Sequence, residues 1–360
     1  MHGSDRGASR IAAIAVGVVA TALSIRLAVP YLAPGAYLPD YTVFWTAARM
    51  AAASPELLYD VQAVTRAQSW LTDPELGARP WAYPPSALLL FGPFALLPVW
   101  WSLLAWNLVS LAAFVAVASR FVRRWGLLLV LVSPPVVWCL LAGQTALMAG
   151  TAILGALLLL PTRPIVAGIL LGLIAAVKPQ LLLLAPVALA VGGHWRALAA
   201  AGVAGVLTGA ASMLLLGWQP WLAWVRALGE FQAIIDAGRL HWLGLTPYSL
   251  AHVLGLARPL KLGFQLAGAA LGLALVVHAF RMPDVRLRAA ALIGGSLLGS
   301  SYAMPYELAM LAPVAAALLL SGPRWGLAAT LALVGAVGLL PLLALLAAAL
   351  MVAQEQAAGA

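Results

Sequence analysis

Apolar segments long enough to enter a membrane recur along the chain from residue 11 to residue 353, and they leave no stretch for a soluble domain. Only 9% of the 360 residues are charged and 64% are hydrophobic, whereas soluble domains carry about 25% charged residues. Lipid can solvate that much apolar surface and water cannot. The sequence therefore predicts an all-α polytopic membrane protein, and it excludes a disordered chain, a collagen-like chain and a nucleic-acid-binding protein.

The apolar segments give about 11 (10–12) transmembrane helices, since a span needs about 20 apolar residues, or somewhat fewer where the membrane is thinned. The last segment contains Pro341 and could form two shorter pieces. The candidate spans are 11–32, 99–119, 125–142, 145–161, 164–177, 180–192, 197–216, 262–280, 287–303, 306–321 and 325–350.

Residues 84–97 are apolar but short, because fourteen residues rise only about 21 Å as a helix and the hydrocarbon core is roughly 30 Å thick. We expect this segment to enter the membrane and return on the same side. Loops rich in Lys and Arg face the cytoplasm, and a re-entrant segment 84–97 leaves most basic loops there. These basic residues are Arg120, Arg123, Arg124, Arg163, Arg196, Arg281, Arg286, Arg288 and Arg324, with Arg6 and Arg10 at the N-terminus.

This threading makes residues 1–360 a single integral membrane domain with two long loops on the periplasmic (extracytoplasmic) face of the cell membrane. The first, 33–98, holds juxtamembrane helices and the re-entrant segment, and the second is 217–260. Acidic residues near a membrane are energetically costly and need an explanation. Those on this face could take part in chemistry there, or they could simply keep the long loops soluble. The eight acids on that face are Asp40, Glu56, Asp60, Asp73, Glu75, Glu230, Asp236 and Glu307.

Asp40 stands at the start of a stretch in which apolar and aromatic residues recur at helical spacing, from Tyr41 to Arg49. This pattern predicts an amphipathic helix in the membrane interface. Asp40 could simply be the N-cap of that helix. A carboxylate at a helix start is also held rigidly, as a general base should be, and the two roles are compatible.

Other polar positions interrupt the apolar sequence, and polar backbone at membrane depth requires a covering of protein or a cavity. Lys178 breaks one apolar run; it could extend to the interface or meet a phosphate. Glu307 fits a helix start, where the helix dipole favours an acid. The remaining interruptions are Tyr59-Asp60, Tyr83-Pro84-Pro85, Ser133-Pro134-Pro135 and Gly143-Gln144.

Taken together and in order, these stretches resemble the polyprenol-phosphate-mannose-dependent α-1,2-mannosyltransferases of glycosyltransferase family 87, membrane enzymes of the GT-C class. The resemblance covers about residues 38–310. Two positions depart from the family pattern: Glu307 stands where an aspartate is usual, and Ala303 and Met304 stand where a histidine is expected. The stretches that carry it are Asp40-Tyr41…Phe44-Trp45…Arg49, Tyr59-Asp60, Tyr83-Pro84-Pro85, Ser133-Pro134, Gly143-Gln144, Lys178-Pro179 and Pro305-Tyr306-Glu307-Leu308.

The resemblance implies a GT-C glycosyltransferase fold, a polyprenyl-phosphate-linked sugar donor, most favourably mannose, and Asp40 as the general base of an inverting transfer. The other partners we expect are a glycolipid or glycan acceptor and membrane lipids. Cations stabilise the charge that grows on the leaving phosphate, and the candidates are Lys178 first, then Arg239, Arg258 and Lys261. The candidate substrate contacts are Trp45, Arg49, Tyr59, Asp60, Tyr83, Gln144, His241, Tyr306 and Glu307.

No pair of ligand residues has a spacing typical of a metal site, so the sequence predicts neither a metal nor a cofactor. His241 and His252 are possible acceptor contacts, although surface histidines more often have no function.

Two alternatives stay open at this point. Within the enzyme class, the donor could carry arabinofuranose or another hexose. A different class, a multi-span transporter or lipid flippase, would place ionisable residues near the membrane midplane and show inverted repeats. The sequence shows no such repeat, which favours an enzyme.

Overall fold

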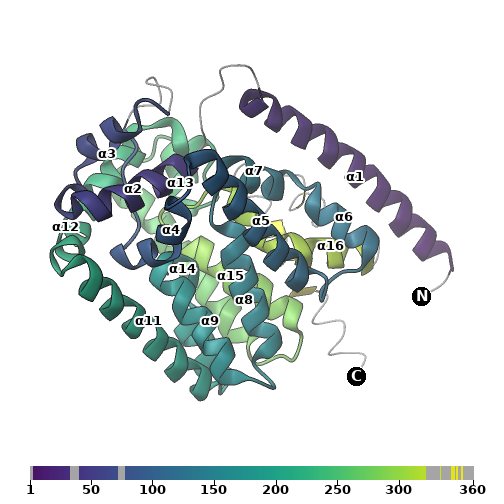
Figure 1. Cartoon of the computed structure of the whole chain (residues 1–360). Coiled ribbons are helices and arrows are strands. Elements are labelled where there is room, and N and C mark those ends of the chain that lie inside the picture. Colours follow the sequence, from purple (N-terminus) through teal and green to yellow (C-terminus); the bar gives the residue numbers. More distant parts are fainter. Residues whose placement is uncertain are drawn as a thin grey trace.

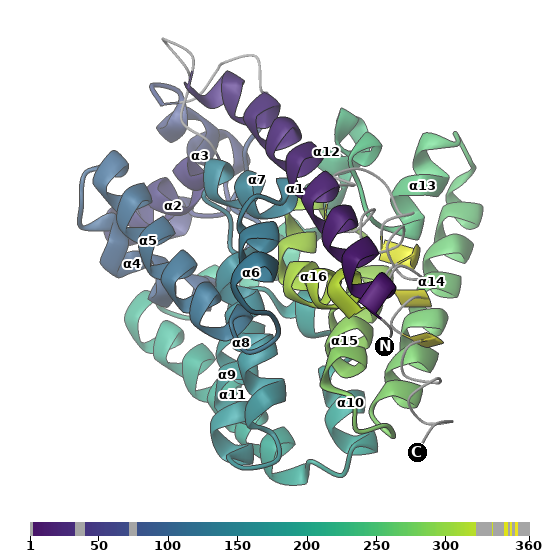
Figure 2. The same cartoon turned by 90° about the vertical axis from the view of Figure 1, so that its right-hand side faces the viewer.

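The computed structural model describes residues 3–32, 40–71 and 78–321, together with isolated residues between 333 and 351. Within this part of the chain all regular secondary structure is helical, as the sequence predicted. The first helix, α1 (Gly3–Leu32), runs along one side of the molecule (Figures 1 and 2). It packs against α6 (Arg124–Leu131), α7 (Pro134–Ala142) and α16 (Ala312–Ser321).

Four helices lie in the upper part of the molecule in both views, where α7 and one end of α1 also lie, and we call this part the upper end (Figures 1 and 2). The long member is α12, whose 19 residues fall in the second predicted loop. The four helices are α2 (Tyr41–Ala53), α3 (Val61–Gln68), α12 (Gln219–Ala237) and α13 (Pro247–Val253); the short helical segments beside them in the chain are η1 (Pro55–Leu57), η3 (Pro85–Ala87), α4 (Leu88–Ala95) and η5 (Arg239–Trp242).

The apolar helices that carry this end form the body of the molecule below it. They are α5 (Val99–Ala118), α8 (Ala146–Leu159), α9 (Pro164–Val177), η4 (Pro179–Leu182), α10 (Ala185–Val191), α11 (Trp195–Leu216), α14 (Arg258–Ala279), α15 (Val285–Gly299) and η6 (Pro305–Leu311). Among them, α9 packs closely against α11, and α14 packs closely against α15.

By length and composition, three helices of the described residues can cross a membrane: α5, α11 and α14. The pair α6 and α7, bent by 52° at its break, brings this number to four. Helices α8 and α9 are apolar but have fourteen residues each, which is short for a full crossing. The structure thus confirms a helical membrane protein. The count of about 11 spans and the GT-C fold stay predictions, and most of the candidate span 325–350 lies outside the described residues.

Several predicted boundaries differ from the observed ones in ways that have physical causes. The prediction for 164–177 coincides with α9. The helix predicted at 262–280 begins earlier, at Arg258, because its first turn is polar and escapes a search for apolar residues. Residues 84–97 contain only η3 and α4, and the eight residues of α4 rise about 12 Å. That length suits a segment that does not cross, but its position relative to a membrane stays a prediction.

Glycines bring α9 and α11 into backbone contact. A Cβ at Gly168 would lie 2.2 Å from the carbonyl oxygen of Ala197, and one at Gly172 would lie 2.3 Å from that of Ala201. Small residues at spacing of four let two helices approach this closely, which is a common packing mode in membranes. We call this contact the glycine seam. It holds α9 against α11, and Lys178 directly follows the last residue of α9.

Candidate active site

The carboxylate of Asp40 is held by two side chains from distant parts of the chain. Its Oδ1 accepts a hydrogen bond of 2.8 Å from Nη2 of Arg79, and its Oδ2 accepts one of 3.0 Å from Nε2 of Gln144. The Asp40 side chain is 48% exposed, whereas that of Arg79 is 11% exposed. A carboxylate fixed on one side and open on the other can accept a proton from a bound molecule.

Asp40 is the N-cap residue of α2, but its side chain makes no capping hydrogen bond. Asp40 therefore occupies the N-cap position, but its carboxylate does not cap the helix. The N–H of Val43 is satisfied instead by the backbone oxygen of Asp40, at 3.0 Å. The carboxylate is left for Arg79 and Gln144.

Gly143 places Gln144 beside Asp40. It ends α7 in the left-handed conformation, with φ of 65°, which glycine adopts without steric cost. A Cβ at this position would lie 2.6 Å from Cβ of Tyr41 and 2.7 Å from Cδ1 of Leu103. The missing side chain thus permits both the turn and the close approach of α2.

Lys178 and Glu307 form a buried ion pair through Nζ and Oε1. Lys178 follows the last residue of α9, and Glu307 lies in the first turn of η6. The lysine Nζ also lies 5.6 Å from the ring centroid of Tyr83 and 5.7 Å from that of Tyr306, within the range of cation–π attraction. The structure therefore brings together four residues that the sequence predicted separately.

Tyr83 lies between α2 and the Lys178–Glu307 pair: its ring is 5.6 Å from Lys178 Nζ, and its centroid is 5.1 Å from that of Phe44 in α2, the helix that begins beside Asp40. Several polar atoms around Tyr83 are buried and have no hydrogen-bond partner among the described residues. Native proteins satisfy nearly all buried polar atoms, so a cluster of unsatisfied ones is informative. In this region they are Arg79 Nη1, Trp81 Nε1, Gln144 Oε1, Thr145 Oγ1 and Glu307 Oε2.

Other predicted site residues bind the chain's own backbone. Trp45 Nε1 donates to the oxygen of Leu97 at 2.9 Å, and Arg49 Nη1 donates to that of Ala95 at 3.2 Å. These two bonds tie α2 to the end of α4. The guanidinium of Arg49 also lies 5.0 Å from the ring centroid of Trp45.

Tyr59 and Asp60 also have structural contacts. The Tyr59 hydroxyl donates to the backbone oxygen of Tyr83 at 2.8 Å, which fixes the backbone of a site residue. The exposed Asp60 caps α3 by accepting from the N–H of Ala63 at 2.8 Å. Asp60 is therefore accounted for as a helix cap.

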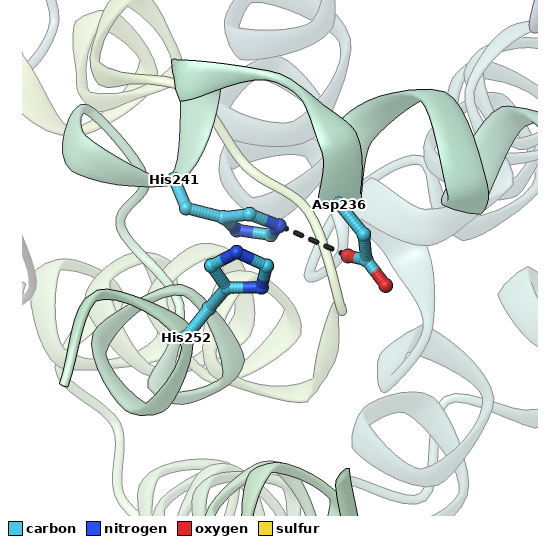
Figure 3. A group of neighbouring side chains, drawn as sticks. All are labelled: Asp236, His241 and His252. Carbon is cyan, nitrogen blue, oxygen red and sulfur yellow. Dashed lines mark hydrogen bonds and ion pairs between the residues drawn. The ribbon is translucent and has the colours of Figure 1, made fainter. Parts of the chain in front are cut away.

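The second predicted loop forms a separate cluster around Asp236, His241 and His252 (Figure 3). His241 Nε2 lies 3.0 Å from Asp236 Oδ1, and Tyr248 Oη donates to Asp236 Oδ2 at 3.0 Å. Burial opposes ionisation of Asp236, but hydrogen bonds from Gln232, His241 and Tyr248 outweigh it and lower the pKa of this carboxyl. Asp236 is an anion at neutral pH.

The predicted phosphate-binding cations of this loop have different surroundings. Lys261 Nζ lies 3.1 Å from Nδ1 of His252, and Arg258 is exposed at the start of α14. Arg239 begins η5, and its side chain lies outside the described residues. Lys178 alone of these four has a described contact with the residues around Tyr83.

The segment before η6 links the two clusters. Ser301 Oγ donates to Oε1 of Gln232 at 3.2 Å, and the N–H of Leu245 donates to the oxygen of Ala303 at 3.0 Å. Ala303 and Met304, which replace the expected histidine, are both buried here.

Sequence reasoning missed Arg79 and the grouping of Asp236 with the two histidines. Arg79 stands two positions before Trp81, in the same predicted loop as Asp40, and this was the available signal. No spacing rule links residues 40 and 79. The ligand-type residues 236, 241 and 252 come from three separate helical elements, so their spacing matches no local metal motif.

Comparisons with known proteins agree with the membrane architecture and give the family of the chain. No curated protein and no solved structure matches the chain significantly. The family model of glycosyltransferase family 87 matches residues 81–305, more than half of the 360 residues. This range includes Tyr83, Gln144 and Lys178, whereas Asp40 lies 41 residues before its start and Glu307 two residues after its end. The match favours a glycosyltransferase over a transporter or lipid flippase. The chain belongs to glycosyltransferase family 87, and it is a membrane glycosyltransferase.

Proposed function

We propose that this protein transfers a sugar, most favourably mannose, from a polyprenyl phosphate to a hydroxyl of a glycolipid or glycan acceptor. The site lies on the extracytoplasmic face of the cell membrane in this proposal. The observation that carries it is the half-exposed carboxylate of Asp40, which Arg79 and Gln144 hold beside buried, unsatisfied polar atoms.

Asp40 acts as the general base in the proposed reaction. It takes the proton of the acceptor hydroxyl, and the hydroxyl oxygen forms a bond to the anomeric carbon of the donor sugar. The bond from that carbon to the phosphate oxygen breaks, and its electron pair leaves with the polyprenyl phosphate. Attack opposite to the leaving group inverts the anomeric configuration.

Lys178 stabilises the charge that grows on the leaving phosphate. An ammonium group has three N–H donors, and one of those of Lys178 is used by Glu307. The other two are available to phosphate oxygens. Glu307 keeps the buried lysine paired while no donor is bound, since an unpaired buried charge is costly. Fixed cations at a developing negative charge lower the barrier without reorganisation.

The unsatisfied atoms match the chemistry of a sugar. Gln144 Oε1 and Glu307 Oε2 are acceptors, and the Thr145 hydroxyl can donate or accept. Sugar hydroxyls can fill both roles, and burying them there would remove the cost of leaving these atoms without partners. This need explains why polar groups persist inside an apolar bundle.

The proposal is tested by an assay of the purified protein in detergent with a labelled mannosyl phosphopolyprenol and a membrane glycolipid fraction. We expect transfer of label by the wild type and by Glu56→Gln, a matched change at an exposed acid of η1. Asp40→Asn keeps the shape and removes the basicity, and should lower the rate by about 10²–10⁴-fold.

Two outcomes would count against the proposal in different ways. Full activity of Asp40→Asn would exclude Asp40 as the base. Transfer from an arabinofuranosyl or glucosyl phosphopolyprenol, with none from the mannosyl donor, would replace the sugar and keep the site.

A further inference from the structure

Asp236, His241 and His252 offer one ligand atom each, and these three atoms lie within 4.8 Å of one another. The residues come from α12, η5 and α13 (Figure 3). The proposed transfer uses none of them. Two imidazoles and a carboxylate are the ligand types that zinc and related divalent ions prefer.

We propose that this cluster binds a divalent transition-metal ion of the zinc type. His241 Nε2, Asp236 and one ring nitrogen of His252 would be its protein ligands. Three protein ligands leave a fourth position of a tetrahedral ion for water. The Asp236 side chain is 34% exposed, whereas that of His241 is 1% exposed, so an ion can enter from the side of the carboxylate.

The groups behind the ligands are those that orient a metal site. His241 Nδ1 lies 3.0 Å from Oγ of Ser249, which is itself buried. The tautomer with its proton on Nδ1, facing this hydroxyl, frees Nε2 for an ion. Asp236 accepts further bonds from Gln232 Nε2 at 2.9 Å and Tyr248 Oη at 3.0 Å. Such bonds fix a ligating carboxylate.

Binding requires two local changes around His252. The rings of His241 and His252 are stacked, with centroids 4.0 Å apart and an angle of 21° between planes. A bound ion lies near the plane of each ligating ring, so one ring must turn, and the less buried His252 is the one with room. Lys261 Nζ, 3.1 Å from His252 Nδ1, is a cation that competes with the ion.

A bound ion would join three elements of the upper end. It would clamp η5 between α12 and α13, and the bond from Ser301 to Gln232 would pass this constraint to the segment before η6. The role inferred is therefore structural: the ion fixes the second loop next to the proposed transfer site.

The test is metal binding by the full-length protein in detergent, after chelation and gel filtration. Titration with Zn²⁺ against a competing dye, and with Co²⁺ followed by its absorption, should each give one ion per chain. His252→Gln and Asp236→Asn should weaken binding by more than the roughly 10–100-fold that loss of an outer-shell partner costs. Ser249→Ala should fall within that range.

Two further variants make the test specific. His278→Gln changes an exposed histidine near the end of α14, and it should bind the ion as the wild type does. Lys261→Met removes the competing cation and should bind it more tightly. Absence of binding by the wild type would overturn the proposal, and this measurement needs no variant to fold. Equal binding by wild type and His252→Gln, or an equal loss in His278→Gln, would also overturn it.

Discussion

Lys178 and Glu307 form an ion pair inside the molecule although 129 positions separate them in the chain. The pair joins the end of α9 to the start of η6, and both side chains are almost completely buried. It therefore contributes to two properties at once: the packing of two helices and the charge of the proposed donor site.

Breaking this pair from one side should destabilise the protein strongly. Lys178→Met leaves the Glu307 carboxylate buried without its partner, which typically costs about 3–5 kcal/mol. The double variant Lys178→Met, Glu307→Leu removes both charges and should recover much of the stability. Thermal unfolding in detergent measures both. If sugar transfer returns together with stability in the double variant, Lys178 has no part in stabilising the phosphate.

Arg79 should matter for the rate of transfer more than for stability. Arg79→Gln removes the 2.8 Å bond that orients the Asp40 carboxylate. A misplaced catalytic group can cost about 10²-fold in rate, so kcat should fall by this order. Arg66→Gln, a change at a basic residue in the last turn of α3, is the control. Equal kcat for Arg79→Gln and wild type would show that Gln144 orients Asp40 alone.

Gly143→Ala should lower stability and transfer together. An L-residue in the left-handed region costs roughly 1–2 kcal/mol, and here the new Cβ also meets Tyr41 and Leu103. Gly229→Ala, in α12 where a Cβ meets nothing within 4 Å, should be neutral or stabilise by about 0.5–1 kcal/mol. Melting temperatures of the two variants give the comparison, and similar values for both would contradict the steric argument.

Asp284 should make stability depend on pH at the acidic end. Burial opposes its ionisation, but the side chain and backbone of Arg286 and the N–H of Leu287 outweigh it and lower the pKa of this N-cap below its ordinary value of 3.8. Because the folded pKa is lower than the unfolded one, the stabilisation is complete above about pH 4 and is lost as the pH falls through the folded pKa.

The matched variant isolates this effect. Asp284→Ala should lose about 1 kcal/mol at pH 7, the typical value of an N-cap. Its difference from the wild type should shrink below about pH 4. Unfolding curves at pH 7, 5, 4 and 3 measure this difference, and a constant difference over that range would contradict the ionic origin.

The sequence was a good guide where a single element decides the structure. Apolar length predicted α9 to the residue, and the helical spacing after Asp40 predicted α2. It was a weaker guide at polar helix starts. Arg258 begins α14, and Pro259 follows it. Proline is common in the first turn of a helix, but a search for apolar residues does not detect this signal.

The candidate site was predictable in its members and not in its pairings. Lys178, Glu307 and Tyr83 were expected from breaks in the apolar sequence, and Tyr306 from the family resemblance. Only the packed helices place them around one ammonium group. The same holds for Arg79 with Asp40. Such contacts depend on tertiary structure, and a single sequence does not indicate that residues 40 and 79 lie close together.

The glycine seam between α9 and α11 has a consequence for how Lys178 is positioned. At Gly168 and Gly172 the backbone of α9 lies directly against the backbone of α11, so at these two points α9 has no side chain that could repack to absorb a shift. Lys178 directly follows α9 and therefore stands at the end of a helix whose position depends on its contact with α11. A side chain at either glycine would push α9 away from α11, and it would displace Lys178, which lies ten residues after Gly168 and six after Gly172.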